Sequence, residues 1–139
     1  MRIMALDFGS KTCGVAVTDA LGITAQGVEI IKRKSPNKLR QTLARIEELV
    51  NKYNVEKIVL GLPLNIDGSS GDRVEKTKEF SEKLSNRVNI PIEFEDERLT
   101  TVEAYEIMDE LNIKKEDRDE YVDMIAAVVI LEQYMNNQK

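Results

Sequence analysis

Histidine is absent from this chain of 139 residues, and cysteine occurs once, as Cys13. The absence of histidine excludes His general-base triads and His-ligated zinc. A single cysteine excludes an internal disulfide and a zinc cluster built from thiolates. Aromatic residues make up only 5% of the chain, which leaves few side chains on which unpaired bases could stack. Any catalysis must therefore use carboxylate, Lys, Tyr, Ser or Thr chemistry.

Long hydrophobic runs are also lacking. No apolar run approaches the ~20 residues that a membrane-spanning helix needs. The first residues reach Asp7 after only four apolar positions, so no secretory core region is present. Repeats, low-complexity tracts and linkers are absent as well. The sequence therefore predicts one domain over residues 1–139, located in the cytoplasm.

The net charge of −5 speaks against a nucleic-acid binder, but the charge is unevenly distributed. Residues 1–70 hold ten Lys and Arg against seven Asp and Glu, so the acidic excess lies in the second half. Within the first half a basic cluster precedes a predicted helix, and it consists of Lys32, Arg33, Lys34 and Lys38. This cluster could contact phosphates or could form a solvated turn.

Hydrophobic periodicity predicts nine elements in the order β-β-β-α-β-α-β-α-α. The expected strands cover residues 3–6, 14–18, 25–31, 57–62 and 90–94, and the first three form an antiparallel meander. Ser35 and Pro36 predict the start of the first helix, as N-cap and first-turn proline. The expected later helices run through 74–84, from Thr100 to about Leu111, and over 121–135. The order predicts an α/β fold, a mixed five-stranded sheet with helices on both faces.

Three acidic residues lie in segments that otherwise look like apolar core. Asp7 and Glu97 follow predicted strands, and Asp123 lies near the predicted start of the last helix. Asp123 shares a stripe with Ala126, Ala127 and Ile130, and small residues there would allow the helix to pack closely on the sheet. Three converging carboxylates would repel one another, whereas Mg²⁺ or Mn²⁺ accepts oxygen ligands and keeps them ionised. The sequence therefore predicts a metal site formed by the three acids.

Each acid also has a simpler interpretation. Asp7 could form a turn with the following glycine, and Asp123 could cap the last helix. Glu97 could be an exposed charge of an edge strand, paired with Arg98. Asp96 competes with Glu97, because strand alternation places the two on opposite faces and does not say which face carries the site.

Four blocks of the sequence strongly resemble the YqgF family of RuvC-like, RNase H-fold nucleases. The blocks begin at Asp7, Val59, Asp96 and Asp123, and their order and spacing extend the resemblance from end to end. Proteins of that family are described as Holliday junction resolvases and, in bacteria, as nucleases that process the 5′ end of the 16S ribosomal RNA precursor. The resemblance implies a metal-dependent phosphodiesterase with Asp7, Glu97 and Asp123 as catalytic acids. The family usually has a basic residue at the position of Thr12.

The cations expected near the substrate phosphates are Lys11, Arg73 and Arg98. For Arg73 the alternative is solvation at the surface, at the start of a helix. The expected partner is structured nucleic acid, either a ribosomal RNA precursor, with precursor particles, or branched DNA.

Two other kinds of function stay open. The first is a nucleotide phosphotransferase of the sugar-kinase and actin sort, although 139 residues leave no room for its second lobe. The second is an RNA-binding module that retained the fold and lost turnover.

Overall fold

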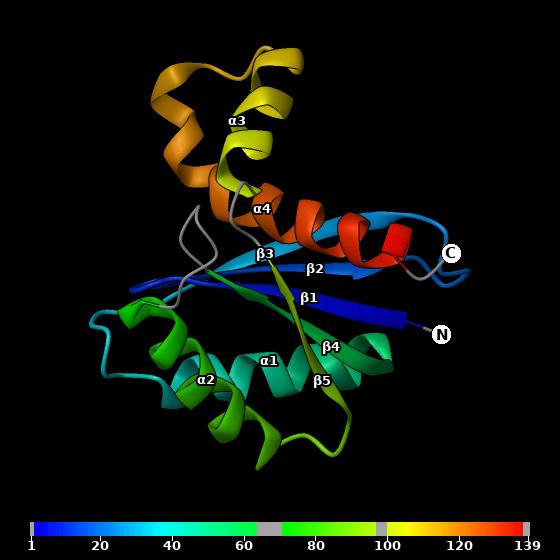
Figure 1. Ribbon diagram of the computed structural model, residues 1–139, viewed down its shortest axis with the longest axis vertical. Helices are drawn as coiled ribbons and strands as arrows, with labels where there is room; N and C mark the ends of the chain where they lie inside the picture. Colours follow the sequence, from blue (N-terminus) through cyan, green and yellow to red (C-terminus); the bar gives the residue numbers. More distant parts are fainter. Residues whose placement is uncertain (1, 64–70, 97–99, 138–139) are drawn as a thin grey trace.

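The computed structural model describes residues 2–63, 71–96 and 100–137, with the side chains of 100–103, 116 and 118–120 excepted. The element order is the one that the sequence predicts. A single five-stranded sheet forms in the order β3-β2-β1-β4-β5 (Figure 1). The predicted mixed sheet is confirmed, because β1 pairs antiparallel with β2 and parallel with β4. The strands are β1 (Arg2–Phe8), β2 (Thr12–Thr18), β3 (Ala25–Lys32), β4 (Val55–Leu62) and β5 (Ile92–Asp96).

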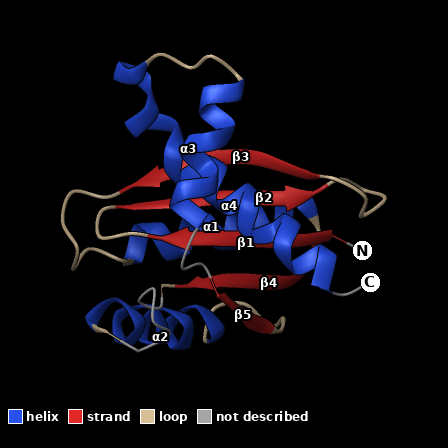
Figure 2. Cartoon of the chain, turned by 45° about the horizontal axis from the view of Figure 1, so that its top comes forward, coloured by secondary structure: helices blue, strands red, loops and turns tan. Residues whose placement is uncertain are grey.

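Helices cover both faces of the sheet, as expected. Figure 1 shows α1 and α2 on one face and α4 on the other, with α3 projecting beyond α4. Figure 2 shows α4 crossing the sheet over its central strands. No described helix has the length and apolar character required to cross a membrane. The helices are α1 (Arg40–Tyr53), α2 (Asp72–Ser85), α3 (Thr100–Glu110) and α4 (Lys115–Asn137).

The larger core lies between the sheet and the α1/α2 layer. Alternate residues of β1, Met4, Leu6 and Phe8, point to this side and are buried. Phe8 stacks on Phe80 of α2 with the ring centroids 4.0 Å apart. The burial of every second β1 residue on this face leaves Ala5 and Asp7 on the face that α4 covers.

The second core, under α4, is built from small residues. Ala5 of β1, Ala16 of β2 and Ala127 of α4 are all buried there, together with Ile130. The predicted stripe of small and apolar side chains on the last helix is therefore confirmed. Because alanine has only a methyl group, the helix axis can come close to the sheet, and this closeness brings α4 side chains to the strand ends.

The start of α1 differs from the prediction. The helix begins at Arg40, whereas Ser35 and Pro36 form a β-turn in which the Lys38 amide donates to the Ser35 carbonyl over 3.1 Å. Proline at the second position of such a turn is favoured as strongly as proline in the first turn of a helix. Apart from Lys32, which ends β3, the basic cluster therefore lies on a loop and turn in front of α1.

The start of α4 also differs from the prediction. The helix begins at Lys115 and not near Tyr121. Its first residues are charged, so they lack apolar periodicity, yet Lys, Glu and Arg are good helix formers. Asp123 is consequently in the interior of α4, and its interpretation as an N-cap is wrong.

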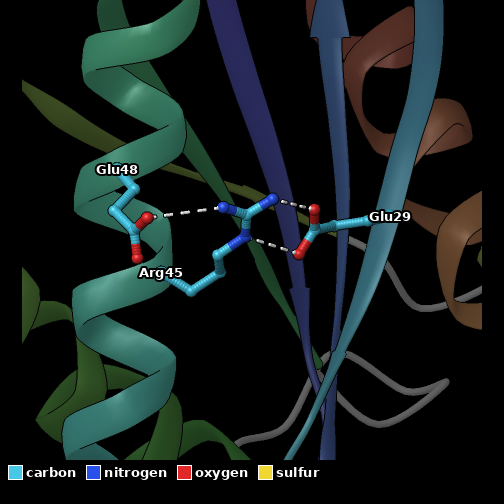
Figure 3. A network of polar contacts seen from close by, with 3 residues as sticks. All are labelled: Glu29, Arg45 and Glu48. Carbon is cyan, nitrogen blue, oxygen red and sulfur yellow. Dashed lines mark hydrogen bonds and ion pairs between the residues drawn. The ribbon is translucent and has the colours of Figure 1, made fainter.

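An ion-pair network ties α1 to β3 on the α1/α2 side (Figure 3). Arg45 donates from Nη2 to Glu29 Oε1 over 2.7 Å and from Nε to Oε2 over 3.0 Å. Glu48, one turn along α1, lies 3.6 Å from Arg45 Nη1. The two hydrogen bonds from Arg45 lower the pKa of Glu29 below its ordinary value of 4.5.

Glu29→Gln should lower the free energy of unfolding by about 0.5–1 kcal/mol at about pH 7. The estimate is modest because the Arg45 and Glu29 side chains are 39% and 29% exposed, so water screens the pair. Because the folded-state pKa of Glu29 is lowered, the stabilisation is present above pH 4.5 and is lost as the pH falls through the folded-state pKa. Urea unfolding at about pH 7 and about pH 3 measures this, and Glu48→Gln is the control expected to change little. An equal deficit at both pH values would contradict the pairing.

Candidate active site

Asp7 is part of the central strand and does not belong to a turn. It lies within β1, directly opposite Gly14 of β2. Alternation places its side chain on the face of Ala5, toward α4, and the residue is half-buried. The turn interpretation of Asp7 is therefore wrong, and the carboxylate lies at the carboxyl end of β1 on the face that α4 covers.

Asp123 lies directly over the strand residue that pairs with Asp7. A Cβ atom added to Gly14 would be only 1.9 Å from the Asp123 carbonyl oxygen. Since Gly14 faces α4 and is the register partner of Asp7, α4 delivers Asp123 to the immediate neighbourhood of Asp7. Two acidic residues that are far apart in the sequence thus lie beside the same position of β2, and only a glycine at position 14 permits this approach.

Thr12 fixes the orientation of the Asp123 carboxylate. Its hydroxyl donates to Asp123 Oδ2 over 2.5 Å from the first position of β2. Thr12 and Gly14 lie on the same face, because Cys13 between them is buried in the core on the other side. No local sequence pattern predicts this role of Thr12, a position at which the YqgF family usually has a basic residue.

The third predicted acid, Glu97, and the cation Arg98 lie outside the described residues. The alternative acid, Asp96, is the last residue of β5, an edge strand. Asp96 shares the strand face of Ile92, which packs on the α1/α2 core and therefore points away from α4. Within residues 2–63, 71–96 and 100–137, no three metal-binding side chains form one cluster.

Two arginines hold the turn that follows Asp7. Arg73 Nη2 donates to the Phe8 carbonyl over 2.7 Å, so this half-buried residue is more than a solvated charge. Arg33 Nη2 donates to the carbonyls of Gly9 and Ser10 over 2.5 and 2.7 Å. The side chain of Lys11, in the same turn, is exposed. The sequence placed Arg33 in a basic cluster without predicting this anchoring role.

The paired carboxylates fit a hard divalent cation. Asp7 and Asp123 could supply the oxygen ligands that Mg²⁺ and Mn²⁺ prefer. The Thr12 hydrogen bond holds one of the two carboxylates in place, as outer partners of metal ligands commonly do. The arrangement lies where the β1 strand ends, a common place for ligands in open α/β sheets.

Comparisons with known proteins agree on one family. The family model described as "RuvX: Holliday junction resolvase" matches residues 1–137. A protein of Agathobacter rectalis named "Putative pre-16S rRNA nuclease" is 58% identical over 136 residues, which cover 98% of this chain and 95% of the relative. A protein of Lachnospira eligens with the same name is 48% identical over 139 residues, covering 100% of this chain and 99% of the relative.

Among solved structures, the fold matches T. thermophilus RuvC in complex with Holliday junction substrate. The TM-score is 0.64 at 13% sequence identity, and the match covers 99% of this chain and 96% of the other. T. thermophilus RuvC in a second structure matches with a TM-score of 0.58 at 14% identity, over the same shares of both chains. At these identities the likeness shows the shared RNase H-like fold, which confirms the fold class expected from the sequence.

Proposed function

The chain belongs to the RuvX family of Holliday junction resolvases, and from this membership we propose that it is a metal-dependent nuclease for structured nucleic acid. The observation that carries the proposal is the convergence of Asp7 and Asp123 across Gly14. Two neighbouring carboxylates, one of them held by a threonine hydroxyl, would repel each other without a cation, whereas together they would bind a divalent metal ion. Phosphodiester hydrolysis is the reaction for which such a site is suited.

Asp7 and Asp123 would hold Mg²⁺ or Mn²⁺, with Glu97 as the third ligand. Glu93 and Glu95 accept hydrogen bonds from α4 side chains, so their strand face is the face of Asp7 and Asp123. Alternation within β5 places Asp96 on the opposite face, which argues against Asp96 as the ligand and supports the proposal of Glu97. When bound, the metal would activate a water and stabilise the departing oxygen.

The remaining groups of the site would bind and orient the substrate. Lys11 is exposed in the turn after β1, where its ammonium group can meet a backbone phosphate. Arg73 holds the Phe8 carbonyl and thereby positions the end of the strand that carries Asp7. Arg98 follows Glu97 and is proposed as a further phosphate contact.

The preferred substrate is the 5′ end of precursor 16S ribosomal RNA, in ribosome biogenesis. The support is that relatives with 58% and 48% identity carry the name of pre-16S rRNA nuclease. Ribosomal precursor particles would then be partners of the protein. A four-way DNA junction is the second candidate, because the family is described by Holliday junction resolution.

The test is a cleavage assay that compares a precursor rRNA 5′ leader with a four-way DNA junction, each with Mg²⁺, Mn²⁺ or a chelator. We expect cleavage of the leader that either metal supports and the chelator abolishes. Cleavage of the junction alone would assign the resolvase activity. RNA binding without metal, unchanged in carboxylate variants and without cleavage, would indicate a non-catalytic module and contradict the nuclease proposal.

Thr12→Val should reduce cleavage by about tenfold or more, since loss of a partner of a metal ligand typically costs 10- to 100-fold. Valine has nearly the shape of threonine but cannot donate to Asp123 Oδ2, so the carboxylate loses its orientation. The metal concentration for half-maximal cleavage should rise, which a purely structural defect would not produce. Thr12→Ser keeps the hydroxyl and should restore most of the activity. Equal metal requirements in the wild type and Thr12→Val would contradict this role.

A further inference from the structure

Two neighbouring cavities lie at the carboxyl end of β1, on the α1/α2 side of the sheet. One has a volume of about 290 Å³ and is lined by Phe8, Ser10, Arg33 and Arg73, among others. The other, of about 420 Å³, lies in front of α1. They share the lining residues Arg33, Asn37 and Leu39, so they adjoin each other, and together they are called here the basic groove.

Arg33 is buried in this groove with hydrogen-bonding capacity to spare. The residue is 9% exposed, and its Nη2 atom donates hydrogen bonds to the Gly9 and Ser10 carbonyls. Its Nε and Nη1 atoms are buried and have no hydrogen-bond acceptor among the described residues. Leaving donors of a charged group unsatisfied is costly, so the position calls for an acceptor that the described part of the chain does not provide.

Arg73 adds a second cation to the same place. The guanidinium carbons of Arg33 and Arg73 lie 4.7 and 6.0 Å from the centroid of the Phe8 ring. Burial lowers the pKa of Arg33, and the charge of Arg73 lowers this pKa further. No ion pair joins either arginine to a carboxylate in the described ranges. An anion between the two would remove their mutual repulsion.

The walls of the basic groove are positive in a chain whose net charge is −5. Glu79 is the one acid among the described residues that line it. The other charged lining residues are all cations, namely Arg33, Lys34, Lys38, Arg40, Arg73, Lys76 and Lys83. Such a concentration of Arg and Lys around one buried and one half-buried arginine suits a phosphate, which Arg can bind with two hydrogen bonds.

We infer that the basic groove binds a backbone phosphate of the nucleic-acid strand whose reacting phosphate lies at Asp7 and Asp123. This inference rests on the proposed nuclease function. Asp7 and Phe8 are consecutive and face opposite sides of the sheet, so the turn over Gly9, Ser10 and Lys11 separates the two sites. A nucleic-acid strand that leaves the carboxylate site and passes over this turn, with its exposed Lys11, would reach the basic groove next. Arg33 and Arg73 thus have two roles: they hold the turn in place and they bind the phosphate of the nucleic-acid strand.

The test measures binding in the full chain that carries Asp7→Asn, so that cleavage does not interfere. The probes are the fluorescently labelled rRNA leader and the four-way DNA junction. Lys76→Gln with Lys83→Gln removes two groove cations, and both residues are exposed on α2. Lys52→Gln with Lys78→Gln is the matched control, because these exposed lysines of α1 and α2 do not line the groove.

We expect the groove variant to bind at least one probe about tenfold more weakly than the control. The slope of log affinity against log salt should fall by about two, one for each lost phosphate contact. Equal weakening in both variants would overturn the inference, because it would indicate only a general charge effect. Unchanged binding in the groove variant would overturn it as well.

Inorganic phosphate provides a separate arm that distinguishes a bound strand from a small anion. Phosphate that raises the melting temperature of the wild type, with probe binding equal in both double variants, would assign the groove to a small anion and overturn the inference. Because these measurements need no cleavage, a groove effect without any nuclease activity would refute the proposed reaction alone. Cleavage by the wild type with no groove effect would refute the groove alone.

Discussion

Replacing Asp7 by Asn should reduce metal-dependent cleavage by about a thousandfold or more. Asparagine has the shape of aspartate but lacks the charge, so the site would lose one of its two described acids. A metal that stabilises the transition state contributes several kcal/mol, and each 1.36 kcal/mol corresponds to about a factor of ten in rate. Initial rates of leader or junction cleavage at saturating Mg²⁺ or Mn²⁺ measure the effect.

The stability of the same variant separates loss of chemistry from loss of folding. In the proposed site the carboxylates of Asp7 and Asp123 would repel each other without a cation, so Asp7→Asn should unfold at an equal or higher temperature than the wild type in chelator. Metal should raise the melting temperature of the wild type more than that of the variant. Glu56→Gln is the control, since Glu56 is exposed near the amino end of β4, away from the site. Undiminished cleavage by well-folded Asp7→Asn would refute the proposed mechanism.

The element order could be predicted because burial leaves a periodic trace in the sequence. Val74, Thr77, Phe80 and Leu84 recur at helical spacing, and these are the buried residues of α2. The continuous apolar run of β4 is explained by its two covered faces, with Leu60 in one core and Val59 in the other.

The starts of α1 and α4 are predicted wrongly, because apolar periodicity does not mark either of them. The first turns of α4 are charged, so apolar periodicity reports only the part of the helix that packs on the sheet. Proline at position 36 suits a β-turn and a first helical turn alike, and the chain adopts the turn, closed by the Lys38 amide. Both helix starts were therefore misplaced by several residues, although the helices themselves were predicted correctly.

Part of the candidate site was readable from the sequence, and part depends on tertiary contacts. Asp7 and Asp123 stand out as charges in apolar segments, and the structure brings them together. The hydrogen bond from Thr12 to Asp123 joins residues 111 positions apart in the sequence, and the one from Arg33 to Gly9 joins residues 24 positions apart. No local sequence pattern indicates contacts over such separations. For the second acid the structure informs only on Asp96: the contact of Glu93 shows which face of β5 α4 covers, and alternation places Asp96 on the other face, while Glu97 lies outside the described residues.

Gly14 has no Cβ atom, and both the packing of α4 on the sheet and the proposed chemistry depend on this absence. A Cβ there would lie 1.9 Å from the Asp123 carbonyl oxygen and 2.4 Å from its carbonyl carbon. These are backbone atoms within α4, so no side-chain rotation can relieve the clash. The helix must shift away from β2, and the Asp123 carboxylate moves with it, away from Asp7 and from the Thr12 hydroxyl.

Gly14→Ala should therefore lower the free energy of unfolding by about 3 kcal/mol, the upper part of the usual range for overpacking. The remaining folded protein should cleave about a hundredfold more slowly, because an ångström of misplacement has that effect. Gly27→Ala, on β3 under the same helix, is the matched control. Its Cβ would meet Met124 Cγ at 2.9 Å, but that flexible side chain can move aside, so stability should change by less than about 1 kcal/mol. Urea unfolding and initial cleavage rates of both variants test this. Equal losses of stability and activity in the two variants would show that the contact between α4 and Gly14 is not what holds Asp123 in place.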